Sequence, residues 1–342
     1  MNFANPSRII QKVIAMVRVA PFFDSRCSGL MYEWPACMYV SLVALRLAVV
    51  VCCAGERPSR VQKVVRLRVN ENETVIKGVT VLGDRIYVVC YESNVIAVFT
   101  SHQPFRRLQD IVVHGLLDPF DIAASVNIGC LYVPDTDSLS VWRINVDSGA
   151  VARWLTGLGA LSVSVTPEDR VVLLVVVGIQ LVGGRIPTWA AKVHVYSADA
   201  VMETVVKLSP DITLPHSVIM TTRKTFIVSH GVELDEMHRV CEVDMTGRVL
   251  KSFGSTPGHG VGQLDTPLRV SLDDEERVIV ANRDNHRVLL LNKQLTSPRV
   301  LVTWPPKSRD DARGPGRLHY DSHTGRLLVG LRSGHVDVYK LK

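Results

Sequence analysis

The sequence predicts an all-β fold, a closed ring of six four-stranded blades (a six-bladed β-propeller), from three observations. Hydrophobic residues make up 47% and aromatic residues 6% of the 342 residues, and valine and leucine dominate the apolar content. Valine favours pleated, half-buried strands over helices. A pattern of short strands recurs six times, which is typical of propeller blades. The last copy lacks its fourth strand, and a matching strand precedes the first copy.

Residues 1–60 are expected to lie outside the ring, as a poorly ordered extension or a hydrophobic helix. Met38–Ala54 is a run of 17 mostly apolar residues interrupted by Ser41 and Arg46. A membrane-spanning helix needs about 20 apolar residues. The run is therefore compatible with a poorly ordered extension, a membrane anchor, a buried helix or, if translation began at Met38, a signal peptide. Pro58 marks the boundary, so the propeller is expected over residues 61–342.

The residues that open the third strand of each blade establish the repeat. They are Ile96, Val141, Val193, Val240, Val288 and Val336, at intervals of 45, 52, 47, 48 and 48 residues. Such constant spacing between short apolar runs predicts one supersecondary unit per repeat.

The strands of the last two blades follow from the apolar pattern. The fifth blade is expected to hold Leu268–Leu272, Val278–Ala281, Val288–Leu291 and Val300–Trp304, and the sixth Arg317–Tyr320, Arg326–Leu331 and Val336–Leu341. Val65, Leu67 and Val69 alternate with arginines before the first blade. We expect this N-terminal strand to pair with the last blade and to close the ring, which would remove an open sheet edge.

Residues Gly260–Val288 carry the most specific motif. A segment with glycines, Gln263 and Pro267 is followed by two apolar strands and by Asn282-x-x-Asn285-x-Arg287-Val288. This resembles the NHL repeat, although Asn282 stands where that family usually has aspartate. The resemblance covers about four-fifths of the chain. The NHL propellers of tripartite-motif ligases bind proteins or RNA, so the resemblance implies an interaction module.

Charge and cysteine usage limit the alternatives. The net charge is +6, of which residues 1–60 contribute +4 (seven basic, three acidic) and the remainder +2 (32 basic, 30 acidic). The propeller is thus nearly neutral, and the overall basicity is no argument for nucleic-acid binding. Cys90, Cys130 and Cys241 have no disulfide-framework or zinc-ligand spacing, which favours reduced, buried thiols. A cytoplasmic location is expected, with secretion or anchoring through residues 38–54 as the alternative.

The candidate ligand-binding site is one mouth of the central channel, where the innermost strand of each blade begins. Closed β-folds gather their binding sites at such mouths. Aligning the six strand starts selects Lys77, Phe120, Asp121, His216, Arg269 and Arg317. Three cations against one acid predict an anionic partner. The alternative is that Arg269 and Arg317 pair with Asp121 or with backbone carbonyls. The insertions Gly183–Trp189 and His230–Met237 are the next candidates.

Metal-dependent enzyme templates fit poorly. Pro215-His216-Ser217 resembles a zinc-histidine segment of the NHL-type amidating lyase, but the equivalent positions in two other blades hold Phe120 and Leu268. A catalytic zinc needs about three protein ligands, so that activity is not expected. Gluconolactonase-type propellers place carboxylates around a divalent ion, whereas Asp121 is the one acid at this mouth. No catalytic residue, metal or cofactor is therefore predicted.

The resulting hypothesis is a non-catalytic scaffold. Its expected partner is a protein or peptide segment, with single-stranded RNA stacked on Phe120 as a further option. A monomer is expected. The alternative function is a lactonase- or lyase-type propeller enzyme with displaced metal ligands.

Overall fold

The computed structural model describes residues 61–342 except 71–73, 177–190, 261, 305–313 and 342. In these ranges the regular elements are all β-strands. None of the described residues forms a helix that is long and apolar enough to span a membrane. The expectations for residues 1–60, including Met38–Ala54, and for the Gly183–Trp189 loop fall outside the described residues and stay predictions.

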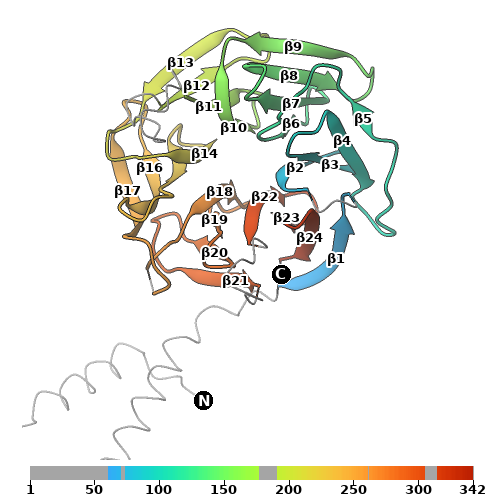
Figure 1. Cartoon of the computed structure of the whole chain (residues 1–342). Coiled ribbons are helices and arrows are strands. Elements are labelled where there is room, and N and C mark those ends of the chain that lie inside the picture. The colour runs from blue at the N-terminus through green and yellow to red at the C-terminus, as the bar shows by residue number, and fades with distance from the viewer. Residues whose placement is uncertain (1–60, 71–73, 177–190, 261, 305–313, 342) are drawn as a thin grey trace, which may run out of the picture. The chain divides into compact units, whose positions relative to one another are not determined.

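Six antiparallel four-stranded sheets form a ring around a central channel (Figure 1). Each sheet is one blade, and its strands run in order from the channel outwards. Blades one to three consist of β2 (Ile76–Leu82), β3 (Arg85–Cys90), β4 (Val95–Thr100) and β5 (Ile111–Val112); β6 (Ala123–Ser125), β7 (Cys130–Asp135), β8 (Ser140–Asn145) and β9 (Val151–Thr156); and β10 (Gly159–Val165), β11 (Val171–Val176), β12 (Ala191–Tyr196) and β13 (Met202–Lys207). Blades four to six consist of β14 (Pro215–Met220), β15 (Phe226–His230), β16 (His238–Val243) and β17 (Val249–Ser255); β18 (Pro267–Leu272), β19 (Val278–Asn282), β20 (Arg287–Leu291) and β21 (Arg299–Thr303); and β22 (Pro315–Asp321), β23 (Arg326–Leu331), β24 (His335–Lys340) and β1 (Gln62–Arg68).

The all-β fold with six blades is confirmed. The predicted strands of blades five and six differ from the observed ones by no more than two residues at either end. Repeating apolar runs were sufficient to locate these strands because most described residues of the second and third strands of the blades are buried.

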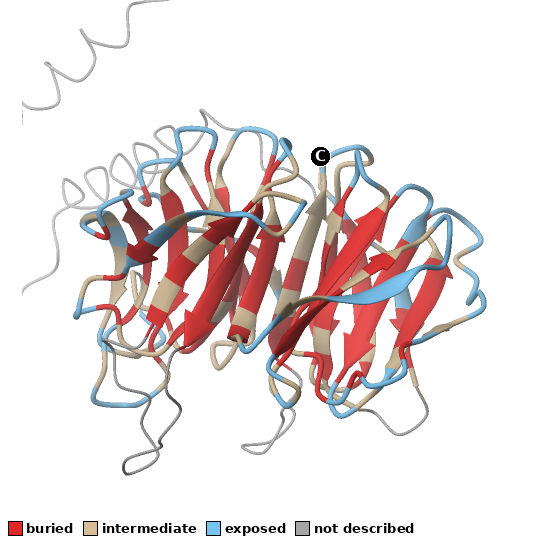
Figure 2. Ribbon diagram, turned by 90° about the horizontal axis from the view of Figure 1, so that it is seen from above, coloured by how far each residue is buried: buried red, intermediate tan, exposed pale blue. Residues whose placement is uncertain are grey.

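The hydrophobic core lies between neighbouring blades rather than in the channel. Each of the six apolar clusters among the described residues joins two adjacent blades, for example Val193 and Val206 of blade three with Val218 and Phe226 of blade four. Figure 2 shows that buried residues fill the inner strands, whereas the outermost strands are largely exposed. Because every blade is covered on both faces by its neighbours, the second strands are apolar without alternation.

Strand β1 occupies the outer position of the sixth blade, where it pairs antiparallel with β24. Arg66 donates two hydrogen bonds to the Asp337 carboxylate, at 2.7 and 2.8 Å, and Lys63 Nζ lies 2.8 Å from the same group. Asp337 is fully buried and also accepts bonds from Trp304 and Tyr339, both at 3.2 Å. A buried carboxylate with this many donors ties the first and last parts of the propeller sequence together.

Candidate functional site at the channel mouth

A β-bulge marks the start of the innermost strand in five of the six blades. The register with the second strand shifts between Ile76 and Gly78 in blade one, and at the equivalent place in blades three to six. The extra residue at each shift is the first of the aligned mouth positions, which places Lys77 and His216 on bulges. A bulge adds one residue and re-aims the local side chains, and bulges are frequent next to binding sites.

In blades two to four, the second aligned position of the strand start connects adjacent blades. Asp121 of blade two accepts a hydrogen bond from the Val163 amide of blade three at 2.9 Å. The hydroxyls of Ser162 and Ser217 accept equivalent bonds from Val218 and Val270, at 3.4 and 3.3 Å. These side chains satisfy backbone amides that no strand partner reaches. This part of the candidate site therefore has a structural role.

Blade one carries glycine at this second position because its neighbour approaches too closely for a side chain. A Cβ atom on Gly78 would lie 2.7 Å from the Ile122 amide nitrogen of blade two. In blade two, Asp121 Oδ1 satisfies that amide itself, at 2.9 Å. Glycine is thus required by close backbone packing rather than by a turn.

Arg269 extends from blade five across the channel to the opposite blades. Its guanidinium forms an ion pair with Asp121 of blade two. It also donates to Ser162 Oγ at 2.8 Å and to the Val163 carbonyl at 3.1 Å. Both charged side chains are buried, and the ion pair neutralises the charge of Arg269. This is the pairing that the sequence left open as an alternative to ligand binding.

Arg317 differs from Arg269 because its hydrogen-bond partners are backbone carbonyls, which is the other pairing that the sequence left open as an alternative to ligand binding. It donates to Lys77 O, to Gly316 O at 2.9 Å and to Phe120 O at 3.3 Å. No ion pair joins it to a described carboxylate. The pKa of Arg317 is lowered to about 10, mainly by burial; Asp121 opposes this shift, and the neighbouring arginines Arg269, Arg283 and Arg332 contribute to it. Arg317 still carries its positive charge at neutral pH.

Aromatic rings hold the mouth cations in place. Lys77 Nζ lies 4.3 Å from the centroid of Phe120 and 4.8 Å from that of Tyr91, and the Arg317 guanidinium lies 5.5 Å from the Phe120 centroid. Burial lowers the pKa of Lys77, and the charge of Arg317 acts in the same direction. Each cation–π contact contributes about 0.5–2 kcal/mol. Lys77, Phe120 and Arg317, predicted from three different strand starts, are therefore brought together.

The sequence alignment of strand starts did not select three residues of this cluster. Tyr91, Arg283 and Arg332 directly follow the second strands of blades one, five and six. The charges of Arg283 and Arg332 act on Arg317, and that of Arg332 also acts on Lys77. Aligning the residue after each second strand would have found these positions, because an antiparallel second strand ends where the first begins.

His216 lies at the mouth as a neutral side chain. Burial lowers its pKa to about 3, and the charge of Arg317 is the next contribution. Its Nε2 atom is buried without a hydrogen-bond partner among the described residues. At neutral pH this histidine can donate or accept one hydrogen bond but adds no charge.

Two other histidines lie near His216, but they are engaged elsewhere. His230 Nε2 accepts a hydrogen bond from Arg239 at 3.2 Å, and His238 Nδ1 accepts one from the Thr266 amide at 3.0 Å. Over the described ranges, no three histidine, cysteine or carboxylate side chains are placed to hold a metal ion.

Known proteins share this fold at low sequence identity. No protein-family model matches the sequence, and no curated protein matches it. Among solved structures, virginiamycin B lyase from Staphylococcus aureus aligns at 8% identity with a TM-score of 0.54, covering 83% of this chain and 100% of the lyase. A catalytically inactive variant of that lyase with quinupristin aligns at 9% identity and a TM-score of 0.56, covering 83% and 99%. The WD40 β-propeller domain of Doa1 aligns at 11% identity and a TM-score of 0.54, covering 82% and 97%.

The six sheets of this chain, together with these similarities, define the class of protein as a six-bladed β-propeller. An enzyme and a WD40 domain are both similar to this chain at the level of the fold. Fold alone does not determine function, which depends on the site that a fold carries.

Proposed function

We propose that this chain is a non-catalytic interaction scaffold whose channel mouth binds an acidic segment of a partner protein. The observation that carries the proposal is the group formed by Lys77, Arg317 and Arg332. Their charges act on one another, and none of the three forms an ion pair with a described carboxylate. Like charges held together at the rim of a channel favour an anionic ligand.

The unsatisfied donors at the mouth support the same conclusion. Arg332 Nε is buried without a hydrogen-bond partner among the described residues, as is His216 Nε2. Leaving a buried polar group unsatisfied costs about 1–3 kcal/mol. A carboxylate at the mouth would accept hydrogen bonds from the guanidinium and relieve this cost.

An acidic peptide fits the mouth better than single-stranded RNA. Lys77 and Arg317 already lie over the Phe120 ring, so a base would have to displace a cation before stacking there. Proteins that bind single strands without sequence preference also present a basic groove along the backbone. The propeller carries a net charge of only +2 over 282 residues.

The proposal also assigns the propeller to the NHL type, on the contacts made by the motif of blade five. Asn282 Oδ1 accepts a hydrogen bond from the Asp265 amide at 2.7 Å. Asn285 Nδ2 donates to Gly258 O at 2.8 Å, and Arg287 donates to Gln263 O at 3.1 Å. The motif residues thus fasten the glycine-containing segment onto the blade. Asp135 accepts the equivalent amide bonds in blade two, from Leu117 at 2.9 Å and Asp118 at 3.1 Å.

A reducing, cytoplasmic environment is part of the proposal. Cys90, Cys130 and Cys241 are free and buried. Burial raises the pKa of Cys90 to about 11 and that of Cys241 to about 12, so these two thiols are poor nucleophiles.

The test measures binding of a short fluorescein-labelled poly-glutamate peptide by anisotropy. Replacing Lys77 and Arg332 together with alanine should weaken binding at least tenfold, or about 1.4 kcal/mol, because two unpaired cations are lost. The matched control replaces Lys224 and Lys293, which lie at the opposite ends of the strands, and should bind like the wild type. Equal affinity of the Lys77/Arg332 variant and the wild type would exclude the mouth as the site.

Two further measurements separate the alternatives. Tighter binding of an oligouridylate of equal length, with an affinity that falls steeply with salt, would replace the peptide by RNA as the partner. One tightly bound metal ion per purified chain would instead favour the lactonase- or lyase-type enzyme.

A further inference from the structure

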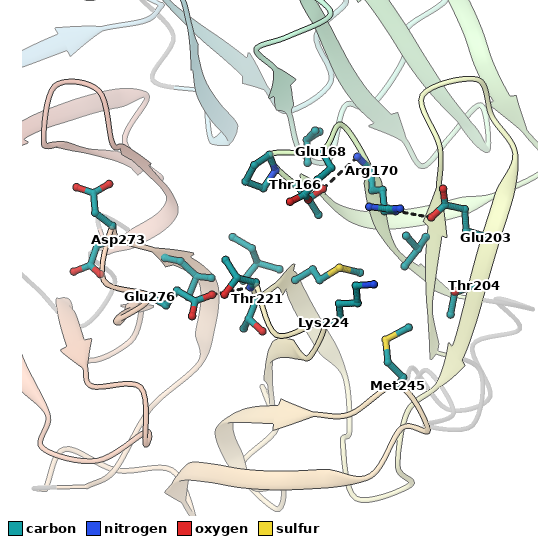
Figure 3. A pocket seen from close by; sticks show the side chains of 18 residues that line it. Thr166, Glu168, Arg170, Glu203, Thr204, Thr221, Lys224, Met245, Asp273 and Glu276 are labelled. Atoms are coloured by element: carbon teal, nitrogen blue, oxygen red, sulfur yellow. Dashed lines mark hydrogen bonds and ion pairs between the residues drawn. The ribbon is translucent and has the colours of Figure 1, made fainter.

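A second hollow lies at the opposite ends of the blade strands from the mouth. It has a volume of about 520 Å³ and is lined by residues of blades three, four and five (Figure 3). These residues include Thr166, Thr221 and Asp273, each of which directly follows the innermost strand of its blade. Because the mouth lies where the same strands begin, the two sites are separated by the length of a strand.

The floor of this hollow is apolar. Val195 is buried, and Ile219, Met220 and Leu272 are half-buried, so the interblade core is incompletely covered here. Met245 also lines the hollow and is 40% exposed. In Figure 3 Met245 lies beside Lys224. Partly exposed apolar side chains in a concave site are typical of surfaces that bind a ligand.

The rim of the hollow is acidic. Five carboxylates and two cations line it: Glu168, Glu203, Asp273, Asp274 and Glu276 against Arg170 and Lys224. Glu203 pairs with Arg170 at 2.6 Å, and Asp273 pairs with Arg277 outside the hollow at 2.6 Å. Glu168, Asp274 and Glu276 form no ion pair with a described cation.

Glu276 is held in its ionised form. Burial is the largest influence and opposes ionisation, but the hydrogen bonds from Thr222, whose amide lies 2.7 Å away, together with the charges of Lys293 and Arg223 outweigh it. The pKa of Glu276 therefore lies below its usual value. Figure 3 shows the Glu276 carboxylate directed toward the blade-four turn.

We infer that this hollow is a second docking site, which binds a segment of a partner protein carrying lysine or arginine next to an apolar side chain. The apolar neighbour would cover Ile219, Met220 and Leu272, and the cation would lie against a carboxylate of the rim, Glu168 or Asp274. The inference does not rest on the proposed function of the mouth. With opposite charges at its two ends, the propeller would hold an acidic and a basic partner at once.

The test uses methyl-¹³C-methionine NMR. The Met220 and Met245 methyl groups report on the hollow, and Met237, near the other end of the strands, is the internal control. The signals are assigned with the substitutions M220L, M245L and M237L. The probe is a short peptide that alternates lysine and leucine, and its control is the same peptide with glutamate in place of lysine. The Met220 and Met245 signals should shift saturably with the lysine peptide, and the Met237 signal should not.

A pair of variants checks the role of the rim. Glu168→Gln with Asp274→Asn should weaken binding of the lysine peptide at least fivefold. The matched control, Asp84→Asn with Asp199→Asn, removes the same charge from exposed positions outside the hollow and should change the affinity less than twofold. Absence of the Met220 and Met245 shifts, equal binding of the glutamate peptide, or unchanged affinity of the rim variant would each overturn the inference.

Discussion

Two arginines at equivalent strand starts have different surroundings, although the sequence presents them alike. Arg269 is paired with Asp121 across the channel, whereas Arg317 donates to backbone carbonyls and has no described carboxylate partner. The difference arises because blade two supplies the one acid among the six strand starts, and Arg269 lies opposite it in the ring. Arg269 is therefore expected to act in stability, and Arg317 in the charge of the mouth.

Replacing Arg269 with alanine should lower the free energy of unfolding by about 3 kcal/mol, because Asp121 would be left buried without its partner. Arg317→Ala should cost less, since it leaves no unpaired charge. Urea denaturation of both variants would check the difference. Equal losses of unfolding free energy in the two variants would mean that the ion pair between Arg269 and Asp121 adds no stability of its own.

Buried histidines should make the propeller sensitive to acid. The pKa of His230 is lowered from 6.5 to about 3, mainly by burial and in part by the nearby charge of Arg239. The unfolded chain therefore binds a proton that the folded chain rejects. The stabilising effect of neutral His230 is fully present above pH 6.5 and is lost as the pH falls toward 3.

Between pH 6 and pH 4 this histidine should contribute a slope of up to about 1.4 kcal/mol per pH unit to the free energy of unfolding. His230→Asn should reduce the slope, as measured by urea unfolding at several pH values. Replacement of the exposed His102 is the matched control. Parallel curves for wild type and His230→Asn would contradict the assignment.

At the scale of elements, the strand starts combine two functions because of the bulge. The bulged residue is released from strict alternation and faces the mouth, as Lys77 does, while the next residue bonds to the neighbouring blade, as Ser162 and Ser217 do. Strand periodicity alone predicts alternation and does not reveal this division.

The pairing of β1 with β24 brings residues from the two ends of the propeller sequence into one sheet. Leu67 and Val69 are buried in the cluster that joins blade six to blade one. Arg66 and Lys63 converge on Asp337. The strand therefore contributes both to the sheet and to the interblade core.

Deleting Val61–Val69 should destabilise the whole propeller, because it would expose the β24 edge and remove part of that core. Thermal melting followed by circular dichroism would measure the effect. Deleting residues 1–58 is the control and should leave the melting curve nearly unchanged. A propeller lacking Val61–Val69 that melts like the intact one would show that this strand does not hold the ring closed.

At the scale of the whole molecule, a nearly neutral propeller places its charges unevenly. Cations collect where the innermost strands begin, and carboxylates collect where three of them end. Because the two ends are separated by the length of a strand, a partner bound at the mouth is expected to stay at that end. The two proposed sites therefore act as separate surfaces on one rigid ring.

The sequence by itself determined the number of blades and most strand positions in the two blades where they were predicted. These features follow from local patterns, because each blade repeats the same apolar runs and every run must be buried between neighbours. The alignment of the six strand starts also selected Lys77, Phe120 and Arg317, since equivalent positions in a closed ring lie at the same end.

Only the tertiary structure decided what those residues contact. Lys77 and Phe120 meet because blades one and two are adjacent, and Arg269 reaches Asp121 because blades five and two are opposite. Such distances depend on ring geometry and side-chain length, which no repeat pattern encodes. The acidic hollow likewise combines turns from three blades, and none of those turns differs from an ordinary solvated turn in the sequence.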